Sequence, residues 1–503
     1  MYPIDLVRHT NPELFIAIVA PVGADSESVC ESLRETLGRF NYTLRPVRVV
    51  EQIRQFEGYL DHEPAEEDEK IKGRMDAGDR FREATKRKDA LALLSLSRVR
   101  RIREESGPSE RPVDRQAYLF RSLKRPEEVT ALRRIYASNL IVIAVHSERE
   151  ERIINLASRI AKSRYSAQSA DFRAEAEKLV LRDESDETTE YGQKLRQAFG
   201  MSDVFLDAGD SQRLRADLDR FFDLLFGKPV ITPTPDEIGM AHAYLAAMRS
   251  AELGRQVGAA ICDSDGKLMA IGTNEVPKAH GGHYWDGDNP DGRDWARGFD
   301  SSDRYKSSSL GELLKTLSDN KMLSENLKNL PIPEQMAQIR PLLKQTRYMQ
   351  LIEFQRAVHG EMSAITDAAS RGVSIKDCTV FVTTFPCHEC ARMIVATGIA
   401  RVVYIEPYAK SLALELHGDS IELGSNGGTG KIPFVPFLGV APRNHVNMFG
   451  MPDRKQPDGT VIGWNPAQAS PRVSGSFWSY LQYEKEDLNF LIGTLEKIGL
   501  KLS

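Results

Sequence analysis

The feature that most constrains this chain of 503 residues is a set of metal-binding side chains between residues 356 and 407. His359 is followed two positions later by Glu361, and Cys387 and Cys390 lie three positions apart further along. One imidazole and two thiolates make three ligands, and a catalytic zinc ion keeps its fourth tetrahedral position for water. The pattern therefore predicts a Zn2+ site with His359, Cys387 and Cys390 as ligands, and Glu361 as the catalytic carboxylate beside it.

The residues around these ligands predict a coherent local structure. Apolar positions with helical spacing predict a helix over 358–372, and the β-branched and aromatic run 379–383 predicts a strand. Pro386 favours the start of a second helix, which would carry Cys387 and Cys390 one turn apart. Because the amino end of a helix favours thiolates, this placement supports metal binding.

A Cys-x-x-Cys pair alone has other uses, as a redox centre or as half of a structural zinc site. A structural site with four ligands needs one more Cys or His nearby, and His388 between the two thiols is the only close candidate. Because the pattern also contains a carboxylate two residues after the imidazole, it favours a catalytic site over a structural one.

Composition limits the classes of function. The net charge of −5 does not favour a protein that holds long nucleic acid through its overall field. Five scattered cysteines do not form a disulfide framework, which indicates a reducing compartment. No apolar run approaches the length of a membrane span, and the first ten residues do not resemble a signal peptide. We therefore expect a cytoplasmic protein without a membrane partner.

The N-terminal region resembles a phosphate-binding loop that has lost its key residues. The apolar run 14–19 predicts a strand, followed by a turn with Gly23 and then a helix. The Walker A pattern needs glycine at both ends and lysine before the Ser or Thr, but Ala20 replaces the first glycine and Asp25 precedes Ser26. An acid beside phosphates is repulsive. We expect a P-loop-like parallel α/β domain without nucleotide hydrolysis, in which Gly23 and Ser26 are candidate nucleotide-binding residues.

Further strands and a linker define the domain organisation. Residues 43–50 predict a second strand, and the apolar run 139–145 predicts a third, as in a parallel sheet. The mixed charges of 61–103 predict a solvated helical insertion or a mobile segment. Three prolines within seven residues, Pro229, Pro233 and Pro235, mark a stiff linker.

These signals divide the chain into three parts. Residues 1–228 are expected to form a degenerate P-loop NTPase or kinase-like domain, and 229–236 the linker. Residues 237–503 are expected to form the zinc domain, with an insertion at about 280–355.

The region after the linker resembles the deoxycytidylate deaminase family of the cytidine deaminase superfamily. The resemblance rests on the Gln-Val-Gly-Ala-Ala strand at 256–260, the segment 272–277 (Gly-Thr-Asn-Glu-Val-Pro), and the zinc pattern; it covers roughly 236–410 outside the insertion. It implies an α/β/α sandwich with a mixed sheet, zinc as cofactor, and a contact of Asn274 with the sugar. The usual His-Ala-Glu is His-Gly-Glu here, a change between small residues.

Other candidate substrate contacts come from residue types. Arg255, Lys278 and Lys410 flank the expected pocket, and cations there would bind phosphate. Tyr408, shortly after the strand predicted to end at residue 405, would stack on or hydrogen-bond the nucleotide, or pack in the core.

The fusion of both domains resembles the bacterial anti-phage dCTP deaminases. This resemblance implies conversion of dCTP, and often dCMP, to uracil nucleotides, which drains the dCTP pool during infection. Some members are held inactive by a small RNA, so an inhibitory RNA is a candidate partner by resemblance, and we expect a homo-oligomer.

Three alternatives stay open. The first is a housekeeping dCMP deaminase that supplies dUMP, and the second a tRNA or single-stranded DNA deaminase, for which the composition offers no basic groove with stacking aromatics. The third is a non-catalytic sensor with structural zinc, which would have no use for Glu361.

Overall fold

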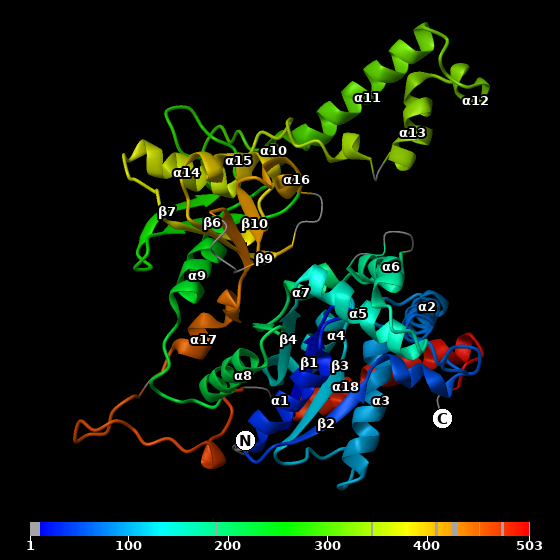
Figure 1. The fold of residues 1–503 in the computed structure, drawn as a ribbon, viewed down its shortest axis with the longest axis vertical. Helices are drawn as coiled ribbons and strands as arrows, with labels where there is room; N and C mark the ends of the chain where they lie inside the picture. Colours follow the sequence, from blue (N-terminus) through cyan, green and yellow to red (C-terminus); the bar gives the residue numbers. More distant parts are fainter. Residues whose placement is uncertain are drawn as a thin grey trace, which may run out of the picture. The chain divides into compact units, whose positions relative to one another are not determined.

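The chain forms two compact units, each with its own six-stranded sheet among the described residues (Figure 1). The computed structural model describes residues 11–184, 186, 190–343, 346–407, 411–424, 430–451, 453–473 and 477–501. The first unit comprises Met1–Glu237 and Phe437–Ser503, and the second comprises Ile238–Pro436. The α/β fold class predicted from the sequence is confirmed in both sheets. No helix within the described ranges combines the length and the apolar character that a bilayer span requires.

The first sheet has the order β12-β5-β4-β1-β3-β2, and all of its neighbouring strands except β12 and β5 are parallel. Its strands are β1 (Leu14–Val19), β2 (Thr43–Arg48), β3 (Gln116–Arg121), β4 (Leu140–His146), β5 (Val204–Asp207) and β12 (Gly439–Val440). All six residues of β1 are buried, because helices cover both faces of the sheet. The carboxyl ends of β1, β2 and β3 therefore meet at one edge.

The two faces of this sheet have separate cores. Leu14, Ile16 and Ile18 pack with α1 (Ser26–Gly38) and α8 (Ser211–Leu225). Phe15, Ala17 and Val19 face the opposite core, which α3 (Ala90–Glu104), α4 (Pro126–Tyr136) and α18 (Phe477–Lys497) cover. Figure 1 also shows α2 (Glu67–Thr85), α5 (Arg149–Ser163), α6 (Arg173–Glu184) and α7 (Leu195–Phe199) in this unit.

The prediction of a solvated segment at 61–103 is wrong for its second half. Residues Ala90–Ser97 are all buried within α3, and Leu93 and Leu94 have no exposed surface. The many arginines of this segment suggested a solvated face, but Arg103 is itself fully buried in an ion pair. Charge counted along the sequence does not reveal a charge that is neutralised inside the fold.

The tail belongs to the first unit, whereas the sequence analysis placed it in the zinc domain at 237–503. Strand β12 pairs antiparallel with β5, and α18 packs on α3 and α4. Arg103 donates to Glu484 of α18 at 2.8 Å and to Glu13 at 3.0 Å, and Tyr480 donates to Glu13 at 2.9 Å. The three charged side chains of this network are fully buried. This long-range pairing has no local sequence signal.

The second sheet has the order β10-β11-β9-β8-β6-β7. Strand β6 is antiparallel to β7 and β8, and the remaining pairs are parallel, so the sheet is mixed as predicted. Its strands are β6 (Gly258–Cys262), β7 (Leu268–Thr273), β8 (Thr379–Thr384), β9 (Arg401–Glu406), β10 (Ile421–Leu423) and β11 (Ile432–Pro436).

Two glycines allow helices to lie close to this sheet on opposite faces. A Cβ on Gly258 would lie 2.0 Å from the carbonyl oxygen of Ala243, in α9 (Pro235–Ala247). A Cβ on Gly272 would lie 2.1 Å from the carbonyl oxygen of Gly360, in α14 (Gly360–Ser370). Because Gly258 and Gly272 point to opposite faces, the result is a three-layer α/β/α arrangement.

The predicted insertion at about 280–355 begins as a loop and becomes helical. It contains α10 (Asp294–Arg297), α11 (Ser301–Asp319), α12 (Glu325–Lys328) and α13 (Ile332–Leu343). Helices α11 and α13 lie side by side and extend away from the sheet of their unit (Figure 1). At its base, Arg356 pairs with Asp294 at 2.7 Å, which fixes the insertion beside the segment that leads to His359.

The buried network around Arg103 generates a stability prediction. Arg103→Leu would leave Glu13 and Glu484 as two buried carboxyls without a cation, and we expect a loss of about 3–5 kcal/mol. Glu484→Gln keeps one of the two acceptors beside Arg103 and leaves Glu13 to neutralise it, so this variant should cost less, about 1.5–3 kcal/mol. Hydrogen–deuterium exchange of the β1 amides measures the opening free energy of this unit alone. Equal exchange in both variants would contradict this account.

Candidate active site

The three expected ligands come together where two helices begin. His359 is the residue before α14, Cys387 is the residue before α15 (His388–Ala396), and Cys390 lies in the first turn of α15. His359 Nδ1 lies 3.2 Å from Cys387 Sγ and 3.4 Å from Cys390 Sγ. Among the described residues, the candidate ligand atoms of these three side chains all lie within 4.8 Å of one another.

The donor set fits zinc. Zn–N bonds of about 2.1 Å and Zn–S bonds of about 2.3 Å place N and S ligands of a tetrahedron about 3.6 Å apart. The two N···S distances are only slightly shorter than this value. The thiols and the imidazole also lie together at helix starts, where the partial positive charge favours thiolates.

A second contact fixes the orientation of the imidazole. His359 Nε2 lies 2.5 Å from Gln355 Oε1, so the amide oxygen accepts the Nε2 proton and leaves Nδ1 free to face the thiols. The sequence analysis missed Gln355. Its only signal is a polar side chain four residues before the histidine, which is too common to single out.

The thiols differ in acidity. A hydrogen bond from Cys390, with the nearby His359 imidazole, lowers the pKa of Cys387 well below its usual value. Burial raises the pKa of Cys390, which has no exposed surface. The first thiolate of the pair is therefore Cys387, beside the imidazole.

Glu361 lies in the first turn of α14 and is 4% exposed. Burial, followed by the charge of Cys387, raises the pKa of Glu361 to about 7, and its carboxyl is in hydrogen-bonding contact with the Cys390 thiol. Among the described residues, no salt bridge engages this carboxyl. Such a group can both accept and release a proton near neutral pH.

Three of the candidate substrate-binding residues already have hydrogen-bond or ion-pair partners within the chain. Asn274 Oδ1 accepts from the Val257 amide at 2.6 Å, and its Nδ2 donates to the Arg255 carbonyl at 2.6 Å. The Arg255 guanidinium pairs with Glu406 at 2.7 Å, and Lys278 pairs with Asp288 at 3.0 Å. Tyr408 and Lys410 lie outside the described residues.

The candidate nucleotide residues Gly23 and Ser26 belong to the first unit. Gly23 has a φ of +87°, and a Cβ there would lie 2.5 Å from the Arg152 carbonyl oxygen, so the glycine is required for packing. Ser26 Oγ accepts from Arg121 at 3.0 Å. Asp25 caps α1, since its Oδ1 accepts from the Ser28 amide at 3.1 Å.

Comparison with known proteins agrees with this geometry. The family model described as the cytidine and deoxycytidylate deaminase zinc-binding region matches residues 233–406, which include His359, Glu361, Cys387 and Cys390. This part of the chain is therefore a zinc-binding region of the cytidine and deoxycytidylate deaminase type.

Within that class, the similarity is to deoxycytidylate deaminases. The Homo sapiens enzyme is 27% identical over 169 residues, 34% of this chain and 63% of that protein. The probable deoxycytidylate deaminase of Drosophila melanogaster is 27% identical over 170 residues, 34% of this chain and 58% of that protein. The chain thus spans about three fifths of the length of these relatives.

A solved structure, the dCMP deaminase from the cyanophage S-TIM5 in complex with dCMP and dUMP, also matches. It is 17% identical, covers 41% of this chain and 98% of that chain, and has a TM-score of 0.23.

The contact between Gln355 and His359 generates a prediction about metal binding. Gln355→Ala removes the acceptor that orients the imidazole, so zinc affinity should fall by about 10–100-fold. Gln355→Glu keeps an acceptor and should stay within a few-fold of the parent, whereas His359→Ala should lose the zinc. Competition with a chromophoric chelator measures the three affinities. Unchanged affinity in Gln355→Ala would show that the contact does not orient the ligand.

Proposed function

We propose that this chain is a zinc-dependent hydrolase that deaminates deoxycytidine nucleotides to deoxyuridine nucleotides and ammonia. The single observation that supports this most is the buried carboxyl of Glu361 beside the His359, Cys387 and Cys390 cluster. A structural zinc site needs no such carboxyl, but a hydrolytic deaminase needs a group that moves protons between water and base. A non-catalytic sensor is therefore disfavoured.

In the proposed reaction, His359, Cys387 and Cys390 would hold Zn2+, which supplies Lewis-acid activation of water when bound. Glu361 takes a proton from the attacking water as the oxygen bonds to C4 of the cytosine ring. The same carboxyl delivers this proton to N3, and then moves the remaining proton of the new C4 hydroxyl to the departing amino group. Water is consumed, the C4–N bond breaks, and ammonia leaves, so the ring becomes uracil.

We propose dCTP as the main substrate and dCMP as a second, with depletion of dCTP as an anti-phage defence. The resemblance of the whole chain to anti-phage dCTP deaminases supports this choice. The curated relatives are deoxycytidylate deaminases, which favours a housekeeping dCMP deaminase as the second candidate. A homo-oligomer and an inhibitory small RNA are proposed on the same resemblance alone.

Phosphate recognition is proposed for Arg255 and Lys278. Arg255 has a side chain that is 49% exposed, at the edge where β8 and β9 end, and its partner Glu406 has a pKa raised by burial. A phosphate competing for Arg255 would therefore replace a carboxylate that is costly to keep charged. Asn274 is proposed to present the sugar side of the pocket, because its amide ties the end of β7 to the segment that leads into β6.

Glu361 provides the direct test of the mechanism. In Glu361→Gln, zinc content should stay at the parent level, while kcat for dCTP or dCMP should fall by about 10²–10⁴-fold, because no group moves the proton. Ammonia release and product mass measure turnover, and elemental analysis measures zinc. A Glu361→Gln protein with parental turnover on any cytosine nucleotide would exclude this mechanism.

Arg255 tests substrate class. A charge-assisted hydrogen bond contributes about 1.5–3 kcal/mol, so nucleotides should exceed deoxycytidine in kcat/KM by roughly two to four powers of ten if two such bonds form. Arg255→Ala should lower kcat/KM for dCTP and dCMP but leave that for deoxycytidine unchanged. Lys267→Ala, at the hairpin between β6 and β7, is a control of equal charge. Equal kcat/KM for deoxycytidine and the nucleotides would indicate a nucleoside deaminase instead.

A further inference from the structure

The first unit contains a cavity of about 710 Å3 at the edge where β1, β2 and β3 end. The chain leaves β1 toward α1 on one face of the sheet and leaves β3 toward α4 on the opposite face. In open parallel sheets, ligands bind at such a divergence point beyond the carboxyl ends of the strands. Residues of α2, α5 and α6 complete the wall, so the space is a lined cavity rather than an open edge.

The lining carries an excess of positive charge. It contains eight Lys and Arg side chains and five Asp and Glu side chains. Several cations are already paired, such as Arg121 with Glu27 at 2.7 Å and Arg74 with Glu51 at 2.6 Å. Arg48 and Lys162 are exposed, and no ion pair engages either one among the described residues. The cavity therefore has cations free to meet an anion.

Buried polar groups of the lining also lack partners. Arg82 is 2% exposed and Gln193 is 4% exposed. Gln193 Oε1 and Ser122 Oγ are buried without a hydrogen-bond partner in the described part of the chain, and Arg82 Nε has only a longer ion-pair contact, with Glu128 Oε1 at 3.6 Å. An unsatisfied buried polar group costs about 1–3 kcal/mol. A polar ligand in the cavity could form hydrogen bonds with these unsatisfied groups.

The loop between β1 and α1 does not offer a phosphate site of its own. The Val22 amide donates to Asp183 Oδ2 at 2.7 Å, and Lys124 pairs with Asp183 at 2.7 Å. Asp25 occupies the start of α1. Carboxylates of the chain thus occupy the amides and the cation that a phosphate would use in a phosphate-binding loop. An anion in the cavity must instead be held by cations outside this loop.

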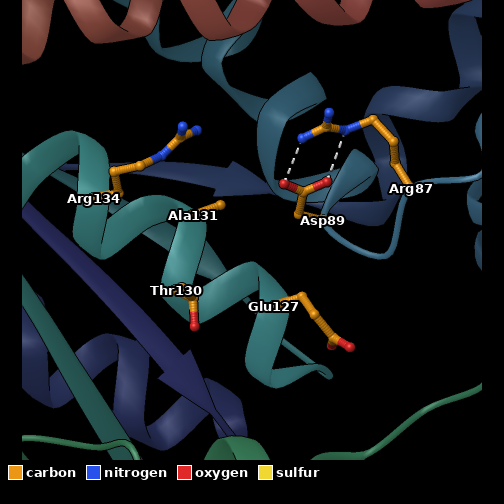
Figure 2. A pocket seen from close by; sticks show the side chains of 6 residues that line it. All are labelled: Arg87, Asp89, Glu127, Thr130, Ala131 and Arg134. Atoms are coloured by element: carbon orange, nitrogen blue, oxygen red, sulfur yellow. Dashed lines mark hydrogen bonds and ion pairs between the residues drawn. The ribbon is translucent and has the colours of Figure 1, made fainter.

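A second cavity of the same unit, of about 310 Å3, shows the contrast (Figure 2). Arg87 and Asp89, which lie side by side in its lining, form a two-bond ion pair at 2.9 and 2.7 Å. Arg134, which lies on α4 in the same view, pairs with Asp487 at 2.6 Å. Its cations are neutralised by the chain, so this cavity offers no comparable site.

We propose that the larger cavity binds a nucleoside polyphosphate, with Arg48 and Lys162 holding phosphate groups outside the β1–α1 loop. The cavity volume of about 710 Å3 lies within the range of about 300–1,000 Å3 that is typical of pockets for small-molecule ligands. Inorganic phosphate alone would leave most of this volume empty. The apolar part of the lining suits a nucleoside: Val22, Val49, Val50, Ile71, Met75 and Leu91. This inference does not depend on the proposed deaminase activity.

The test uses the full-length, zinc-loaded protein and isothermal titration calorimetry with ATP, GTP and inorganic tripolyphosphate. None of these probes contains cytosine, so binding at the candidate active site is not expected to dominate. We expect at least one of the two nucleotides to bind, at least ten-fold more tightly than tripolyphosphate, because only the nucleotide uses the apolar wall. Equal binding of all three probes would overturn the nucleoside part, and no binding would overturn the site.

Charge reversals locate the binding. Arg48→Glu/Lys162→Glu should weaken nucleotide binding by about 10²-fold or more, since two charge-assisted contacts are lost. Both residues are exposed and form no ion pair with any described residue, so the fold should persist, which circular dichroism verifies. Arg34→Glu/Arg101→Glu is the matched control: both arginines are exposed, lie in the same unit and do not line the cavity. Equal weakening in both double variants would overturn the assignment, because it would reflect overall charge alone.

Discussion

The ion pair of Arg103 with Glu13 and Glu484 joins three segments of the first unit that are far apart in the sequence. Glu13 directly precedes β1, Arg103 lies near the end of α3, and Glu484 lies on α18. A buried cation between two buried carboxylates tolerates little displacement, since each lost contact leaves a charge without solvent. One face of the β1 core is therefore closed by α18, a helix hundreds of residues away in the sequence.

In the second unit, the candidate catalytic residues are positioned by two helices that begin next to each other. Helices α14 and α15 both begin beside the cluster, so each contributes its first residues and its N-terminal partial charge. Gly272 allows α14 to lie against β7, which sets the position of His359 and Glu361 together. Backbone packing thus determines where the reactive groups lie, and the hydrogen bond to Gln355 orients the imidazole of His359.

Local patterns predicted much of this structure, and long-range pairing explains what they missed. The apolar run of β1 and the spacing of the zinc ligands were sufficient, because each depends on neighbouring residues. Strand β3 (Gln116–Arg121) was not predicted, although it lies inside the sheet between β1 and β2. The burial of Arg103 and the return of the tail to the first sheet depend on partners hundreds of residues away. The contact of Gln355 depends on side-chain orientation, which spacing alone does not give.

The nested order of the two units has a consequence for how the chain is made. Ile238–Pro436 is contiguous, whereas the first unit needs Met1–Glu237 together with Phe437–Ser503. On a ribosome, domains generally fold as units while the chain emerges. The second unit can thus complete its contacts before α18 is made. At that stage the first unit still lacks α18 and its Glu484, the partner of Arg103. Until α18 has been made, the apolar residues that it covers stay exposed. The unit whose synthesis begins first is therefore the last to complete its fold.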